Sequence, residues 1–507
     1  MCKPPSDEAV RGMLGPALSP DVTIEKIQLV LSIRPQKIYE VSLSDGKTVQ
    51  LVLPPHSMWR PLRSEQGMVA SEAAAVRWMS ETLTRQKTTP PIQQEGPSSS
   101  SSKPALTTTT TATTAPLLPL LLPTLLHHGQ KPYLPETSFA VYAPVRGTPL
   151  ALLSPAPPSP TCQQEDTDRQ LGTLFRHLAT LTSPTGRFGP LAAVLTGASS
   201  PQPAPHHLSV GRVAKIPKVL VEGGLSVTGG AGAWSVAFQS MLEGVLRDGE
   251  DMAVVMAYPT IRRHFRRLGY LLDEVTVGRL VVVEGAGTGN PLVVEVEEGG
   301  GQEGGKGEEE EEQGRGGEKE QEEVVGEVDT EEEKSEATTQ TETDTQHTRP
   351  RPNLKLTGLR DWSSCVFGDP LLAAVFSDLH QQPPSTAFLE GFNGDDDDDD
   401  DDDKPDHPRH AHAHHHLPYP LNRTVIEDID TAWIRLLFYQ VYHAVARIVG
   451  EFYRPRQDST ARELEARRKL NEVLARLAEV PDDAKKRHKR PSGEMSPAKR
   501  IRGLGDE

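Results

Sequence analysis

Alternating hydrophobic and polar positions predict a β-hairpin near the start of the chain. Residues 38–43 (Ile-Tyr-Glu-Val-Ser-Leu) alternate with period two, residues 44–47 (Ser-Asp-Gly-Lys) have the composition of a turn, and residues 48–53 (Thr-Val-Gln-Leu-Val-Leu) alternate again. Apolar residues at helical spacing follow around residues 71–79. We therefore expect residues 22–85 to form a strand-rich block that ends in a helix.

A second folded block, with more predicted helix than strand, begins near residue 117. Short β-branched or apolar runs predict strands at residues 138–143, 279–283, 292–294 and 354–356. Apolar residues at helical spacing predict helices over residues 168–181, 234–246, 261–272, 433–452 and 460–478. The last of these helices is mostly charged and has Glu/Lys and Glu/Arg pairs four residues apart, which stabilise an exposed helix.

Composition divides the chain into folded blocks and low-complexity segments. Hydrophobic residues are 36% of the 507, and the net charge is −17. Residues 295–344 hold 21 acidic and 4 basic side chains, and Asp395–Asp403 adds nine aspartates, so the rest of the chain sums to +9. The acidic balance therefore belongs to two solvated runs rather than to a folded surface. We expect disordered inserts at residues 86–115, 295–350 and 393–417.

Cysteine content and hydropathy indicate a soluble protein of a reducing compartment. Three cysteines are too few for a disulfide framework, and the longest apolar stretch, residues 117–126, contains two prolines and is about half the length that spans a bilayer. The N-terminus lacks the pattern of a signal peptide. Two basic clusters, residues 485–490 and 499–502, have the spacing of a bipartite nuclear localisation signal, and a solvated basic tail is the alternative. The expected location is cytoplasmic or nuclear.

One segment carries a family resemblance. Residues 356–370 read Leu-Thr-Gly-Leu-Arg-Asp-Trp-Ser-Ser-Cys-Val-Phe-Gly-Asp-Pro, a predicted strand that ends in Asp-Trp and is followed by Gly-Asp-Pro. With the order of predicted elements, this segment resembles the metal-binding motif of the aminoglycoside phosphotransferase family. The resemblance covers roughly residues 35–85, 130–295 and 354–380. It implies a two-lobed, protein-kinase-like fold that uses ATP and Mg²⁺; an ordinary strand followed by a turn is the alternative.

The resemblance also implies roles for particular residues. Asp361 would bind Mg²⁺, with Asn290 as the second metal ligand. Glu72 would lie on the helix that faces the nucleotide, although a solvated helix residue is the alternative. Val141 and Ala143 would belong to the hinge strand that contacts the adenine.

Two departures from the family pattern predict weakened chemistry. The family's catalytic aspartate would fall on Gly285, and the nearest carboxylate, Glu284, is one position away. The family's strand lysine would fall on Val52. Because kinases act mainly by positioning and by neutralising charge, we expect slow transfer of phosphate to the hydroxyl of an unidentified small molecule. The alternative is an inactive pseudokinase that serves as a nucleotide-sensing or protein-interaction scaffold.

We therefore expect an α+β, two-lobed protein-kinase-like fold with long disordered low-complexity insertions. The boundaries are an N-terminal tail (1–21), an N-lobe (22–143), a helical C-lobe (144–480) and a basic disordered tail (481–507). The acidic and basic segments are candidate contacts for protein partners. Membrane binding is not expected. Nucleic-acid binding is not expected either, because the arginines of residues 262–267 are interpreted as the solvent-exposed face of a helix. The glycines of residues 285–289 are read as a tight turn, and the histidines of residues 407–416 as a loop rather than a metal site.

Overall fold

The computed structural model describes eleven ranges of the chain. They are residues 5–30, 35–56, 59–88, 121–131, 134–153, 162–197, 229–286, 289–296, 353–379, 383–394 and 419–481. The three predicted inserts and the basic tail lie almost wholly outside these ranges. At the edges of the inserts, residues 86–88 belong to a helix, residues 295 and 296 to a strand, and residue 393 to another helix.

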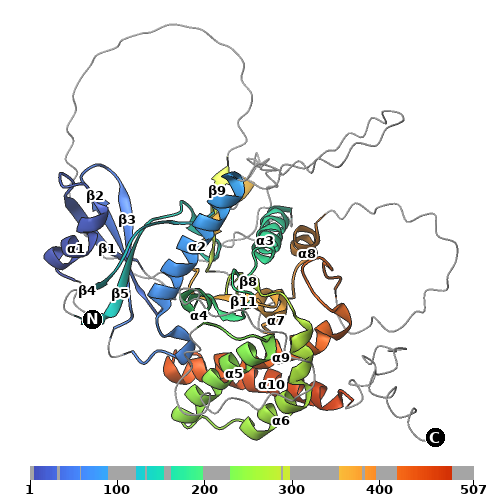
Figure 1. Ribbon diagram of the computed structural model, residues 1–507. Helices are drawn as coiled ribbons and strands as arrows, with labels where there is room; N and C mark the ends of the chain where they lie inside the picture. The colour runs from blue at the N-terminus through green and yellow to red at the C-terminus, as the bar shows by residue number, and fades with distance from the viewer. Residues whose placement is uncertain are drawn as a thin grey trace, which may run out of the picture. The chain divides into compact units, whose positions relative to one another are not determined.

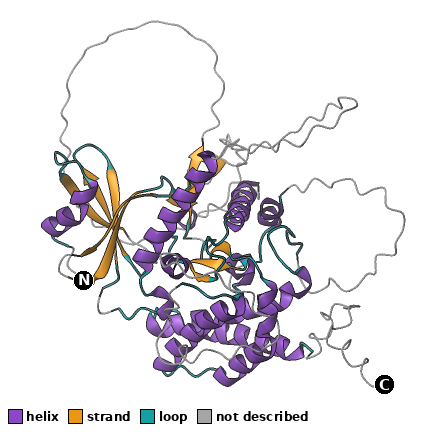
Figure 2. Cartoon of the chain, in the orientation of Figure 1, coloured by secondary structure: helices purple, strands orange, loops and turns teal. Residues whose placement is uncertain are grey.

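A five-stranded antiparallel sheet forms the N-terminal part of the molecule (Figure 2). Its strands are β1 (Ile24–Val30), β2 (Lys37–Leu43), β3 (Thr48–Leu53), β4 (Thr124–Lys131) and β5 (Leu134–Ala143), in the order β1-β2-β3-β5-β4. The predicted hairpin is confirmed, since β2 pairs with β3 from Lys37 opposite Leu53 to Ser42 opposite Thr48. Gly46 has a φ of +78° in the connecting turn, a conformation that glycine adopts without strain.

The two faces of this sheet pack against different helices (Figure 1). Alternate side chains of the sheet, such as Tyr39 and Val41, form one apolar cluster with α1 (Asp7–Leu14). The side chains between them, such as Ile38 and Val52, join the cluster that contains α2 (Met68–Thr88). The prediction of a tail over residues 1–21 was therefore wrong, because α1 buries three apolar side chains (Val10, Met13 and Leu14) on the sheet.

Helices make up most of the described residues after the five-stranded sheet. They are α3 (Cys162–Thr180), α4 (Leu191–Gly197), α5 (Trp234–Asp251), α6 (Tyr258–Leu268), α7 (Ala374–Ser377), α8 (Thr386–Asn393), α9 (Ile429–Tyr453) and α10 (Ser459–Glu479). Within the described ranges, 3₁₀ turns lie at Gly15–Ala17, Arg63–Glu65, Leu150–Leu152, Gly269–Glu274 and Pro370–Leu372. In the described part of the chain, no helix is both long enough and apolar enough to cross a membrane.

Two small sheets lie among these helices. One has the order β10-β9-β6, from β6 (Thr148–Pro149), β9 (Pro291–Val296) and β10 (Asn353–Leu359). The other has the order β7-β11-β8, from β7 (Gly189–Pro190), β8 (Arg279–Val282) and β11 (Cys365–Gly368). These sheets bear on the candidate site because Glu284 follows β8, Asn290 directly precedes β9 and Asp361 follows β10.

The expected mixture of helices and strands is confirmed. Each predicted strand and helix within the described ranges is present, with ends that differ by several residues. Nine of the described helices and strands were not predicted: α1, α4, α7, α8, β1, β4, β6, β7 and β11. The helix predicted over residues 261–272 is α6 followed by the 3₁₀ turn Gly269–Glu274.

Candidate functional site

Asn290 and Asp361, which are far apart in the sequence, are in direct contact. The Oδ1 atom of Asn290 accepts a hydrogen bond from the backbone N–H of Asp361 at 2.7 Å. The Nδ2 atom of Asn290 donates to the carbonyl oxygens of Asp361 (3.3 Å) and Glu284 (3.2 Å). Since its side chain is 7% exposed, Asn290 acts in this structure as a buried tie between two loops. It brings together the three residues predicted at the centre of the site.

The Asp361 carboxylate is half-buried at the end of β10. Its Oδ1 atom accepts the backbone N–H of Ser363 at 2.8 Å, which holds the turn after the strand. The next residue, Trp362, donates its backbone N–H to Oε1 of Glu72 on α2 at 3.4 Å. Glu72 is 3% exposed, so the alternative of a solvated helix residue is wrong. Both carboxylates thus lie beside the same turn.

The thiol of Cys365 lies near these two carboxylates and is buried. Cys365 is the first residue of β11. Burial raises the pKa of its thiol well above the ordinary value, and the negative charges of Asp361 and Glu72 raise it further. The thiol therefore stays in its neutral form beside the two carboxylates.

The predicted hinge residues are placed differently from one another. Val141 is fully buried in β5, opposite Leu51 of β3 and His127 of β4, and its side chain packs in the cluster that contains α1. The structure therefore gives Val141 a packing role. Ala143 ends β5 and is half-buried. Val52, where the resemblance would place the family's lysine, is 2% exposed within the apolar core.

Glu284 lies just after β8, with 60% of its side chain exposed. Its backbone N–H donates to Oγ of Ser364, and its Oε1 atom lies 3.7 Å from Nδ1 of the buried His443 on α9. The surrounding chain raises the pKa of the Glu284 carboxyl by limiting its hydration, whereas the positive charge that His443 would carry lowers it. Because most of this side chain is in water, we expect the net shift to be small.

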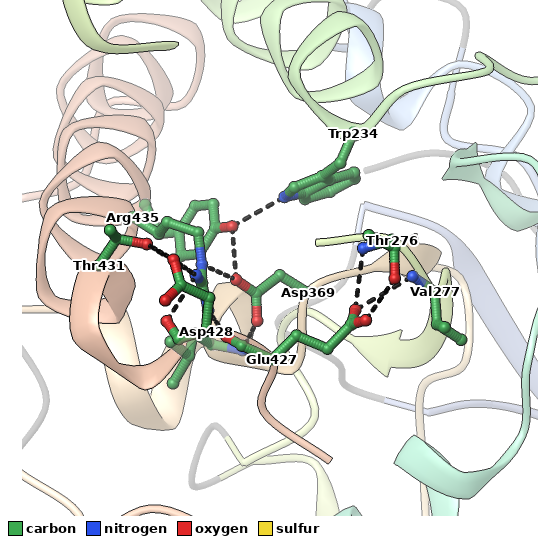
Figure 3. A network of polar contacts seen from close by, with 10 residues as sticks. Trp234, Thr276, Val277, Asp369, Glu427, Asp428, Thr431 and Arg435 are labelled. Carbon is green, nitrogen blue, oxygen red and sulfur yellow. Dashed lines mark hydrogen bonds and ion pairs between the residues drawn. The ribbon is translucent and has the colours of Figure 1, made fainter. Parts of the chain in front are cut away.

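A buried polar network adjoins this region (Figure 3). Oδ2 of Asp369, in the Gly-Asp-Pro segment, accepts Nε–H of Arg435 and the hydroxyl of Tyr439, both at 2.8 Å. The Tyr439 oxygen in turn accepts the indole N–H of Trp234 at 2.8 Å. Asp369 and Arg435 are 1% and 0% exposed. The remaining guanidinium hydrogens go to Thr431 and to the backbone carbonyls of Glu427 and Asp428.

The charged and polar groups of this network have enough hydrogen-bond partners to be stable in the core. Burial alone would lower the pKa of the Arg435 guanidinium, but the charge of Asp369, the hydrogen bond to it and the nearby Tyr439 and Asp428 together outweigh burial, so the pKa is raised. Burial also raises the pKa of Tyr439 well above its ordinary value, so its hydroxyl remains a donor. Gly368 is required beside it, since a Cβ atom there would lie 2.4 Å from the Trp234 ring.

Four side chains on α9, which we call the α9 stripe, hold the segment that follows Asp361. Arg435 and Tyr439 bind Asp369, His443 bonds the carbonyl of Leu372 at 2.9 Å through Nε2, and Arg447 pairs with Asp378. The stripe was missed from the sequence. Its signal is present, however, because these four residues recur every fourth position in a helix that is otherwise strongly apolar.

The candidate metal ligands do not form a ready-made cation site. In the ranges that the structure describes, no three His, Cys, Asp or Glu side chains are grouped as metal ligands. The histidine-rich segment lies outside those ranges.

Comparison with known proteins gives no further guide to the function: no protein-family model matches the chain, and no curated protein sequence matches it.

Proposed function

We propose that this protein is a kinase-like phosphotransferase homologue of low activity, similar to aminoglycoside phosphotransferases. It would transfer the γ-phosphate of ATP to the hydroxyl of a small molecule. The proposal is supported above all by the Asn290 amide, which joins the loops of Glu284 and Asp361 through three hydrogen bonds. A convergence of a proton acceptor and a cation ligand is what phosphoryl transfer requires.

The described residues fit Mg²⁺ only in part. Magnesium is held in proteins by one or two carboxylates together with waters and substrate phosphates, and the half-buried Asp361 carboxylate could serve as such a ligand. The Oδ1 atom of Asn290 already accepts the Asp361 N–H, so it contributes less than the resemblance implies. When bound, the cation would neutralise charge on the phosphate oxygens.

Glu284 is the candidate for accepting the proton of the attacking hydroxyl. Its carboxylate is exposed, and its backbone is fixed by bonds to Ser364 and Asn290. A positioned general base contributes about 10²–10⁴-fold to the rate. Because Glu284 is one position away from the family's aspartate, we expect a contribution at the lower end of that range.

The inactive scaffold remains the second candidate, and Val52 favours it. The family uses a strand lysine to bind the nucleotide phosphates, whereas Val52 is an apolar side chain buried in the core. Loss of that ammonium removes a charge contact to ATP without disturbing the fold. A protein of this kind could bind a nucleotide without turning it over.

The two candidates are separated by measuring binding and turnover on the full-length chain. Binding is followed by the thermal shift with ATP in the presence and absence of Mg²⁺, and turnover by phosphate release from ATP, for which water serves as the acceptor. We expect Mg²⁺-dependent stabilisation and slow release, both lost in Asp361→Asn. Glu284→Gln should retain the stabilisation and lose the release. Glu40→Gln removes an exposed carboxylate of β2 and is the matched control.

Each outcome decides between the readings. Stabilisation without release identifies the scaffold. Stabilisation and release that survive Asp361→Asn would show that the nucleotide binds elsewhere. If the wild-type chain shows neither, phosphotransfer and nucleotide sensing are both wrong, and the protein-interaction scaffold is the candidate that is left.

A further inference from the structure

A cavity of about 330 Å³ lies between α2 and β4, and none of the proposed site residues lines it. From α2 it is lined by Arg77, Ser80 and Thr84, and from β4 by Leu125, His127 and His128. Leu122 and Leu83 close part of it with apolar surface. A small concave site with a few converging polar groups is the usual form of a ligand pocket.

Two nitrogen-bearing side chains of this cavity, Arg77 and His128, are the candidate anion ligands. Arg77 is exposed and forms no hydrogen bond or ion pair with any residue that the structure describes. The Nε2 atom of His128 is buried and has no hydrogen-bond partner in the described part of the chain. A buried nitrogen without a partner is costly, so a ligand atom or a water is expected there.

The lining has one carboxylate, that of Glu81, and it does not neutralise the positive charge of Arg77. Glu81 is 54% exposed and pairs with Arg85 at 3.6 Å, one turn further along α2. Burial, followed by the charge of Arg77 and the proximity of His127, lowers the pKa of His128. This shift is consistent with a positive potential inside the cavity, and an anion would relieve it.

We propose that the cavity between α2 and β4 binds a small oxyanion group, such as the phosphate or carboxylate of a metabolite, with Arg77 and His128 as its direct partners. The guanidinium would pair with two oxygens of the anion, and the Nε2–H of His128 would donate to one of them. The Ser80 hydroxyl lies in the same lining and is a further donor. This site is independent of the proposed phosphotransfer function.

Isothermal titration calorimetry on the full-length chain tests the proposal, with inorganic phosphate and succinate as separate probes at constant ionic strength. We expect saturable binding of at least one probe, and the tighter probe identifies the preferred class of anion. Arg77→Gln and His128→Gln should each weaken it about tenfold or more, since each removes a hydrogen bond to a charged group. Arg468→Gln is the matched control, because Arg468 is an exposed arginine of α10 that does not line the cavity.

A further variant separates this site from the candidate active site. Binding should be unchanged in Asp361→Asn, whose side chain is not part of the cavity. Absence of saturable binding for both probes would overturn the proposal. An equal loss in Arg468→Gln and Arg77→Gln would also overturn it, because the effect would then be one of net charge alone.

Discussion

Two aspartates eight residues apart, Asp361 and Asp369, have opposite environments. Asp369 is 1% exposed, and its carboxylate is bound by Arg435, Tyr439 and the backbone N–H of Leu371. Asp361 is half-buried, its Oδ1 atom bonds a backbone N–H two residues away, and its main chain rather than its carboxylate is held by Asn290. A buried carboxylate whose oxygens are all hydrogen-bonded stabilises the fold. A half-buried carboxylate that its neighbours hold in position can also contact a ligand from solvent.

The α9 stripe explains how the two aspartates are related. By holding Asp369, the Leu372 carbonyl and Asp378, it fixes the chain on the far side of β11. The main chain before β11 is fixed by Asn290 and Glu72. Stability and candidate chemistry are therefore divided between the two ends of one short strand, and substitutions should separate them.

The largest effect is expected for Asp369→Asn. It leaves the Arg435 guanidinium buried without its counter-charge, which typically destabilises a protein by about 3–5 kcal/mol. Asp361→Asn keeps an acceptor for the Ser363 N–H and should cost at most about 1 kcal/mol. Urea unfolding followed by circular dichroism measures both changes. Equal losses for the two variants would show that the division between stability and chemistry is wrong.

A smaller effect is expected for Tyr439→Phe. The variant removes the hydroxyl that donates to Asp369 and accepts the Trp234 indole N–H, so the free energy of unfolding should fall by about 1–3 kcal/mol. The control is Tyr419→Phe, because the Tyr419 hydroxyl makes a single long bond of 3.4 Å to the Phe376 carbonyl. The idea of a cooperative network fails if the control loses as much stability as Tyr439→Phe.

Local sequence signals predicted the elements that depend on local physics. The β2–β3 hairpin followed from period-two alternation around an Asp-Gly turn, and α9 followed from a long apolar run. β4 was missed because Thr124–Lys131 (Thr-Leu-Leu-His-His-Gly-Gln-Lys) has one β-branched residue and no alternation. β11 was missed because a four-residue strand carries too little pattern.

Partners far apart in the chain could not be read from spacing. The Arg435–Asp369 pair joins residues 66 positions apart, and nothing local to either one indicates the other. The convergence of Asn290 and Asp361, 71 positions apart, was predicted only through the order of elements that the family resemblance supplied. The capture of the Asn290 amide by backbone groups depends on loop geometry, which the sequence does not encode in any short pattern.

The last prediction concerns Cys365, which lies between the two aspartates in the sequence and is buried. In a variant with Cys2 and Cys162 replaced by serine, Cys365 is the single thiol. Because burial first, and then the charges of Asp361 and Glu72, raise its pKa well above the ordinary value, the thiol stays protonated at pH 8. We expect alkylation by iodoacetamide to be slower by orders of magnitude than in the unfolded chain.

Adding the aspartate substitutions to this single-thiol chain turns the reaction into a probe of the comparison. Alkylation of a buried thiol proceeds through local or global opening of the fold. Asp369→Asn should accelerate it, because the weakened core opens more often. Asp361→Asn removes one of the charges that raise the thiol pKa but leaves the burial, so alkylation of the native protein should stay slow. Rapid alkylation in Asp361→Asn without loss of stability would instead mean that the Asp361 charge, rather than burial in the core, keeps Cys365 unreactive.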